Sequence, residues 1–225
     1  MADKHAWWTS IVEPYKLLEM EIEMSKYLFI ESSVRGQASA SGQLAARLKA
    51  QVQAAGHTVA TRDVGADPLP PLDGALLGAL FSAADGRSAE QQAQADRVTA
   101  LIDELQAADT VVIATGMYNF GMPAQLKTWF DYVLQAGKTF RYTAEGPVGL
   151  VTGKQAIILA ATGGIYSSGP AAAADFMVPH VKQMLAFIGI TDVTVVRAEG
   201  LALGDESAQA GMAKAFSVVE TLQAA

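Results

Sequence analysis

Short apolar runs alternate along this chain with longer segments in which apolar residues recur every three or four positions. The runs at 27–30, 110–114 and 156–160, together with the more polar segments at 57–63 and 192–197, predict five strands. The most continuous of these runs are typical of strands buried on both faces of a sheet. The regular alternation of strand and helix predicts one doubly wound α/β domain with a parallel sheet and right-handed crossovers.

Residues with known end preferences indicate where the helices begin and end. Apolar residues recur at helical spacing over 44–52, and Gly56 is placed to end that helix. Ser88 and Gln91 have the spacing of a capping box, which predicts a helix running to about residue 107. Further helices are expected over 74–84, 123–137, 175–188 and 205–222.

The number of strands narrows the fold class. Five strands favour a flavodoxin-like sheet with helices on both faces over the six-stranded dinucleotide-binding arrangement. Residues 138–153 are expected to form an irregular excursion rich in Gly and Thr. Residues 1–23 stand outside the regular pattern. They could be a short helix, an extension or the product of an upstream start, and we interpret them as an accessory segment.

Composition and charge exclude several classes of protein. The chain has 225 residues, of which 51% are hydrophobic and 17% charged, so wholesale disorder is excluded. A net charge of −7 without any basic run predicts no nucleic-acid binding. The absence of cysteine excludes disulfides and a thiol nucleophile, and no histidine pair has metal-ligand spacing. Without a membrane span or a secretory signal, we expect a cytoplasmic protein.

Three loops that follow predicted strands carry the candidate chemistry, because ligands of such sheets bind beyond the carboxyl ends of the strands. Residues 32–41 are rich in serine at the start of a helix, where hydroxyl and amide groups suit a phosphate. Residues 115–123 combine two aromatic side chains with Asn119, which suits a planar ligand. Residues 161–166 contain adjacent glycines that let a flat ligand approach the backbone. Each loop also has a purely structural reading: an N-cap, a piece of core or a flexible connection.

Several separated motifs resemble the FMN-dependent NADH-azoreductases, which are also NADH:quinone oxidoreductases. These are Met-Tyr-Asn-Phe at 117–120 with P-x-x-L-K at 123–127, T-F-R-Y-T-x-x-G-P-x-G-L at 139–150, A-F-I-G-I-T-D-V at 186–193 and A-E-G at 198–200. The resemblance runs from about Met24 to the C-terminus. It therefore implies a flavodoxin-like domain over 24–225 that binds FMN without a covalent bond and forms a homodimer with FMN at the interface.

By position, the resemblance assigns residues to each part of FMN. The phosphate is expected to contact Ser33 and the turn of Ser39, Ala40 and Ser41. The flavin ring is expected to rest against Met117, Tyr118, Asn119 and Phe120, with its far edge at Ala161, Thr162, Gly163 and Gly164. An aromatic substrate box is expected from Phe120, Tyr142 and Phe187, the last two from the other subunit. Phe187 could instead belong to an apolar helix face.

Two positions depart from the family pattern. The family commonly has Ser-Arg-Gly-Gly where this chain has Ala161-Thr162-Gly163-Gly164, so a cation near the flavin is absent. The family often has histidine where this chain has Tyr166, which can donate a hydrogen bond but is a poorer proton relay at neutral pH. These departures bear on the reduction potential and the rate.

The resemblance implies an oxidoreductase that takes two electrons from NADH and passes them to quinones or aromatic azo compounds by a ping-pong mechanism. One alternative is a flavodoxin-type one-electron carrier, which shares the fold and the acidic charge. A second is a flavin-binding or flavin-free interaction protein that docks through residues 1–23. The sequence does not separate NADH from NADPH as donor, and it does not identify the physiological acceptor.

Overall fold

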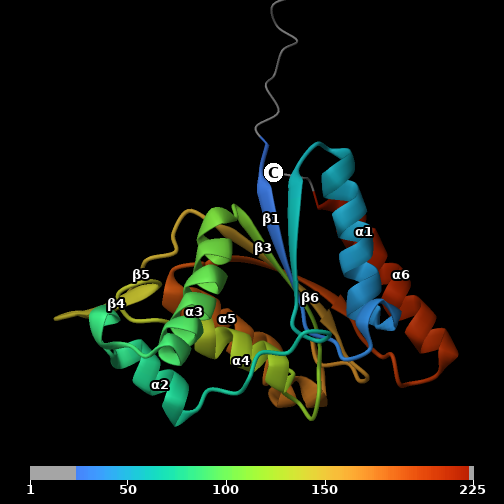
Figure 1. Ribbon diagram of the computed structural model, residues 1–225. Helices are drawn as coiled ribbons and strands as arrows, with labels where there is room; N and C mark the ends of the chain where they lie inside the picture. The colour runs from blue at the N-terminus through green and yellow to red at the C-terminus, as the bar shows by residue number, and fades with distance from the viewer. Residues whose placement is uncertain (1–23, 223–225) are drawn as a thin grey trace, which may run out of the picture.

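The structure is a computed structural model that describes residues 24–222 of the chain (Figure 1). Its centre is a five-stranded sheet in which every pair of neighbours is parallel. The strands lie in the order β2-β1-β3-β6-β7, which is the flavodoxin-like order, and the predicted fold class is confirmed. Their bounds are β1 (Lys26–Glu31), β2 (Thr58–Asp63), β3 (Thr110–Gly116), β6 (Gln155–Ala161) and β7 (Asp192–Ala198).

Six α-helices cover the two faces of this sheet in the described part of the chain. Helices α1 (Ala40–Ala54) and α6 (Asp205–Thr221) lie side by side on one face (Figure 1). The other face carries α3 (Ala89–Ala107), α4 (Ala124–Val133) and α5 (Met177–Ile188), with the short α2 (Gly74–Phe81) packed against α3. Each face therefore has its own hydrophobic core.

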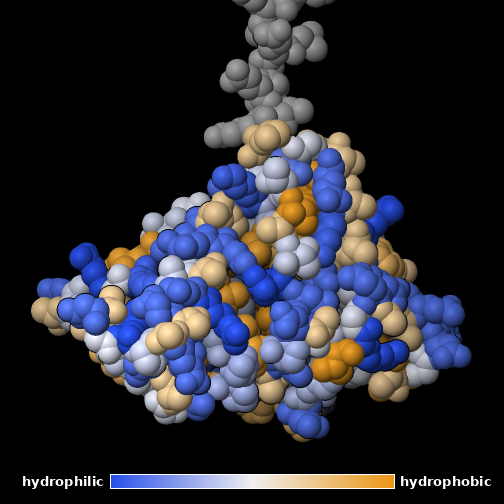
Figure 2. All heavy atoms as spheres, viewed as in Figure 1, coloured by the Kyte–Doolittle hydropathy of each residue, from blue (hydrophilic) through white to orange (hydrophobic). Residues whose placement is uncertain are grey.

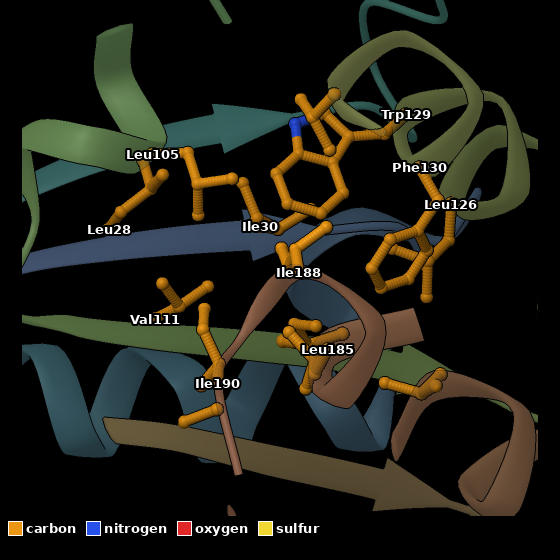
Figure 3. Close-up of a cluster of buried hydrophobic side chains, with 14 of the residues drawn as sticks. Leu28, Ile30, Leu105, Val111, Leu126, Trp129, Phe130, Leu185, Ile188 and Ile190 are labelled. Atoms are coloured by element: carbon orange, nitrogen blue, oxygen red, sulfur yellow. The ribbon is translucent and has the colours of Figure 1, made fainter. Parts of the chain in front are cut away.

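The larger core is built around aromatic side chains of α4. Trp129 and Phe130 are fully buried and stack edge to face with ring centroids 5.0 Å apart. Figure 3 shows Trp129 beside Ile30 of β1, and Leu28 of the same strand beside Leu105 of α3. Tyr27 and Phe29 belong to the core on the other face, so β1 is apolar at successive positions. The hydroxyl of Tyr132 donates to the carbonyl of Pro70 (2.9 Å), and burial raises the pKa of this tyrosine. The outer surface is mostly hydrophilic on the face shown in Figure 2.

Most predicted helix ends are confirmed. The capping box is present, with the Ser88 hydroxyl accepting from the Gln91 amide and the Gln91 side chain accepting from the Ser88 amide. Gly189 ends α5 in the left-handed conformation, with φ of 106°. Gly56 follows α1 with φ of 90°, a conformation that strongly favours glycine.

The segment after α4 differs from the expectation of an irregular excursion. It contains an antiparallel hairpin of β4 (Phe140–Thr143) and β5 (Gly146–Gly149). Helix α4 also ends at Val133 rather than near Gly137. The Thr139 hydroxyl donates to the Val133 carbonyl (2.7 Å) and accepts from the Gln135 amide (3.0 Å), so a side chain replaces the next helical turn and redirects the chain.

Two further predictions concern membrane spans and the N-terminal segment. No helix among residues 24–222 is long and apolar enough to cross a membrane. The accessory role assigned to residues 1–23 lies outside the described residues and stays a prediction.

Candidate functional site

Three loops leave the carboxyl ends of β1, β3 and β6, which are neighbours in the sheet. The register aligns Glu31 of β1 with Ala114 of β3, and Gly116 of β3 with Ala161 of β6. Hydrogen bonds continue past the strands, because the Ser32 amide donates to the Ala114 carbonyl (3.1 Å) and the Met117 amide to the Ala161 carbonyl (2.9 Å). The three loops singled out by composition therefore begin side by side at one edge of the sheet.

The first loop forms a cradle, which we define as residues 32–42, at the N-terminus of α1. The Ser39 side chain caps the helix, accepting from the Gly42 amide (3.0 Å) and donating to the Gly36 carbonyl (2.6 Å). Its oxygen lies 3.4 Å from that of Ser41, and both residues are buried. The amides of Ala40 and Ser41 lie in the first turn of the helix, where backbone amides have no intrahelical acceptor.

Close backbone approaches fix the shape of the cradle. A side chain on Gly65, in the loop after β2, would place its Cβ 2.4 Å from the carbonyl oxygen of Ser33. A Cβ on Gly42 would lie 2.5 Å from the carbonyl oxygen of Gly36. Gly36 itself has φ of 52°. Only glycine meets these constraints without moving the cradle backbone.

The second loop is a tight turn that presents aromatic rings. Tyr118 and Gly121 exchange two backbone hydrogen bonds (2.9 and 3.0 Å) around Asn119 and Phe120. Both central residues have positive φ, 48° and 70°, which matches a type I′ turn. Asparagine tolerates this conformation, whereas phenylalanine is strained in it, and such strain concentrates at functional sites. Phe120 is 52% exposed.

A cavity of about 360 Å³ lies between the cradle loop and the aromatic turn. Its walls come from Val34 on one side and from Tyr118, Asn119 and Met122 on the other, with Gln125 at the start of α4. A crevice too narrow to hold a water molecule lies within the cradle and is lined by Glu31, Ser33, Gly36, Ser39, Ser41, Gly42 and Ala114. The serine hydroxyls and backbone amides of the cradle thus lie next to the larger cavity, which is bordered by the ring of Tyr118 and the side-chain amide of Asn119.

The third loop is held by Glu199, a residue to which the sequence pattern assigned no role. A carboxylate oxygen of Glu199, just after β7, accepts from the amides of Tyr166 and Ser167 (both 2.8 Å). Arg197 bonds Asp175 (2.8 Å) and lies 3.7 Å from Glu199. The A-E-G motif contained Glu199, but only the fold brings it to this loop.

The predicted aromatic residues fall into two groups. Phe120 and Tyr166 face each other edge to face across the second and third loops, with centroids 6.4 Å apart. Phe187 packs on Phe140 of the hairpin (4.5 Å), and Phe140 packs on Tyr142 (5.5 Å). In Figure 1 the hairpin lies on the opposite side of the molecule from α1. The described contacts of one chain thus do not join Tyr142 and Phe187 to the three loops.

The comparisons with known proteins agree with this geometry. A family model described as having a flavodoxin-like fold matches residues 25–222. An FMN-dependent NADH:quinone oxidoreductase of Agrobacterium fabrum is 47% identical over 203 residues, which is 88% of this chain and 98% of the relative. The chain belongs to the family of FMN-dependent NADH:quinone oxidoreductases. As a member of this family it is an oxidoreductase.

Solved structures extend the likeness of this oxidoreductase to the azoreductases. An azoreductase from Bacillus anthracis strain Sterne has a TM-score of 0.77 at 33% identity, covering 88% of this chain and all of its own. An FMN-dependent NADH-azoreductase from B. anthracis strain Ames Ancestor, solved in complex with FMN, has a TM-score of 0.78 at 26% identity. That match covers 88% of this chain and 98% of the other.

Proposed function

We propose that this oxidoreductase binds FMN at the three loops and uses NADH to reduce quinones and to cleave aromatic azo compounds. The observation that carries the proposal is the placement of the cradle beside the exposed aromatic turn, at the carboxyl edge of the sheet. This is where ligands of doubly wound sheets bind.

The residues present fit the two chemically different ends of FMN. The helix N-terminus of α1, with buried Ser39 and Ser41, offers hydroxyl and amide donors for the phosphate, together with Ser33 and Ala40. The turn of Met117, Tyr118, Asn119 and Phe120 offers aromatic faces and an amide for the ring. The backbone of Ala161, Thr162, Gly163 and Gly164 borders the far side, where Thr162 donates to the Gly164 carbonyl (2.8 Å).

FMN, when bound, supplies the two-electron redox chemistry, and the protein positions it and its reaction partners. A quinone takes up two electrons and two protons to become a hydroquinone. An azo compound takes up four electrons and four protons, hence two molecules of NADH, to become two amines. We propose that donor and acceptor occupy the same aromatic surface in turn, which gives ping-pong kinetics.

Exposed aromatic side chains support both the acceptor class and a homodimer. Phe120 and Phe176 are 52% and 63% exposed, and the Phe176 amide donates to the Phe120 carbonyl (3.2 Å). Tyr142 on the hairpin is 73% exposed. Because exposed rings gather at protein and ligand interfaces, we propose that a second copy covers this surface. That copy would supply Tyr142 to the substrate box, together with the edge of the packed Phe140 and Phe187 rings. Tyr166 would donate a hydrogen bond to the acceptor.

The decisive experiment is a visible spectrum of the full chain with FMN, followed by anaerobic addition of NADH and then of a quinone. We expect bound flavin whose absorbance bleaches with NADH and returns with the quinone. Bound flavin that NADH cannot bleach would favour the one-electron carrier. A chain that binds no flavin would contradict the proposal. The cytoplasmic location stays a prediction.

A further inference from the structure

A carboxylate lies where the proposed site would receive an anion. Glu31 is the last residue of β1, is only 6% exposed, and lines the same closed crevice as Ser33, Ser39 and Ser41. An uncompensated buried carboxylate is unfavourable in itself, and it would also repel a phosphate bound to these serines. Its charge therefore needs a partner if the cradle is to hold an anion.

That partner is Lys49, in the third turn of α1. Its Nζ lies 2.5 Å from a carboxylate oxygen of Glu31, and the two side chains are only 18% and 8% exposed. The ammonium group also lies 5.1 Å from the centroid of the Phe29 ring, which favours a cation. The other carboxylate oxygen accepts from the side-chain amide of Gln37 (2.9 Å), within the cradle loop.

We infer that the Lys49–Glu31 pair sets the affinity of the cradle for the phosphate of FMN. The Glu31 carboxylate holds the cradle loop through Gln37, and the Lys49 ammonium group compensates the negative charge that Glu31 places beside the anion site. Both are positioning residues, since they act through the cradle and its field. The inference rests on the proposed function, because it requires FMN to bind here.

The test compares FMN with riboflavin, which has the same ring system but no phosphate. Flavin-free full-length protein is titrated with each by fluorescence quenching, and the quantity of interest is the ratio of the riboflavin Kd to the FMN Kd. Lys49→Met leaves the Glu31 charge facing the phosphate. We expect its ratio to fall by roughly tenfold, the scale of a unit-charge interaction in the effective dielectric of a protein.

Two further variants separate charge from packing. Glu31→Gln leaves Lys49 as an uncompensated cation near the phosphate, so its ratio is expected to rise above that of the wild type, most clearly at low salt. Lys49→Met combined with Glu31→Gln removes both charges and is expected to bring the ratio back toward the wild-type value. Lys49→Arg keeps the cation and is expected to retain the ratio.

Arg47→Gln is the matched control on the same helix. Arg47 pairs with Glu220 of α6, and both side chains are more than half exposed, so removing this charge is expected to leave the ratio unchanged.

The outcomes keep the inference apart from the proposed function. A wild-type chain that binds no FMN contradicts the proposed function. If the wild type binds FMN but Lys49→Met changes the Kd for FMN and the Kd for riboflavin by the same factor, the inference is overturned. The pair would then only join β1 to α1. If Lys49→Met does not fold, Glu31→Gln is the test. A ratio of riboflavin Kd to FMN Kd equal to that of the wild type would then overturn the inference.

Discussion

The cradle and the aromatic turn leave neighbouring strands of one sheet but are built in opposite ways. In the cradle, Ser39 and Ser41 are buried, and backbone contacts with Gly36 and Gly65 fix the chain. In the turn, Asn119 and Phe120 are exposed and held in left-handed conformations by one pair of backbone hydrogen bonds.

Under the proposed function, this difference follows from what each loop would bind. A phosphate is recognised by several donors converging on one point, so the donors must be fixed and kept from competing with water. An aromatic ring is recognised by contact with a flat, open face, so the side chain must be presented outward. Rigidity comes from packing in the first loop and from a strained turn in the second.

The largest effect is expected on FMN affinity, from a side chain added where Gly65 lies against the cradle. Gly65→Ala would place a Cβ 2.4 Å from the Ser33 carbonyl oxygen, so the cradle backbone must move. We expect FMN affinity to fall about a hundredfold, the equivalent of about 2.8 kcal/mol. Flavin fluorescence titration measures it. Gly78→Ala, where the added Cβ meets open space in α2, is the control. Equal FMN affinity in the two variants would contradict a rigid cradle.

In the aromatic turn, backbone strain can be separated from the ring. Phe120→Gly and Phe120→Leu both remove the ring, and we expect acceptor turnover to fall by up to about tenfold in each, since an aromatic contact contributes up to about 1.5 kcal/mol. Only glycine relieves the positive φ. The glycine variant should therefore be at least as stable to urea as the leucine variant, although it removes more side chain. A clearly less stable glycine variant would show that the turn is not strained.

The third loop has a smaller, local dependence on Glu199. Glu199→Ala removes the acceptor for the amides of Tyr166 and Ser167, and we expect a loss of about 1–2 kcal/mol in the free energy of unfolding. Hydrogen exchange at these two amides should accelerate. Glu199→Gln retains an acceptor oxygen and serves as the control. Unchanged protection in Glu199→Ala would mean that other contacts hold the loop.

The smallest effect is expected from Tyr166→Phe. This change keeps the ring that faces Phe120 and removes only the hydroxyl. If the hydroxyl donates one hydrogen bond to the acceptor, kcat/KM for a quinone should fall about fivefold, because a neutral hydrogen bond contributes about 1 kcal/mol. FMN affinity should not change. A loss of FMN binding would place the hydroxyl at the cofactor instead.

The strands, the helix ends and the position of the three loops could be predicted from local sequence patterns. Apolar runs and the alternation of strand and helix located the five strands. The rule that ligands bind beyond the carboxyl ends of parallel strands then selected three loops by their serines, aromatics and glycines. Helix ends followed from residues with strong local preferences, such as Ser88, Gln91 and Gly189. Such features depend on neighbours within a few positions, which is the range over which a sequence pattern is informative.

Other features needed the fold, because they join residues distant in the chain. The approach of Gly65 to Ser33, the bonds from Glu199 to the third loop and the pairing of Glu31 with Lys49 have no local sequence pattern. The hairpin was missed because Thr139 ends α4 through a side-chain bond rather than through a residue typical of a helix end. The sequence by itself thus determined the strands, the family and the chemistry of the three loops. Tertiary structure decided which of their groups are fixed, strained or charge-compensated, because those properties depend on contacts that only packing creates.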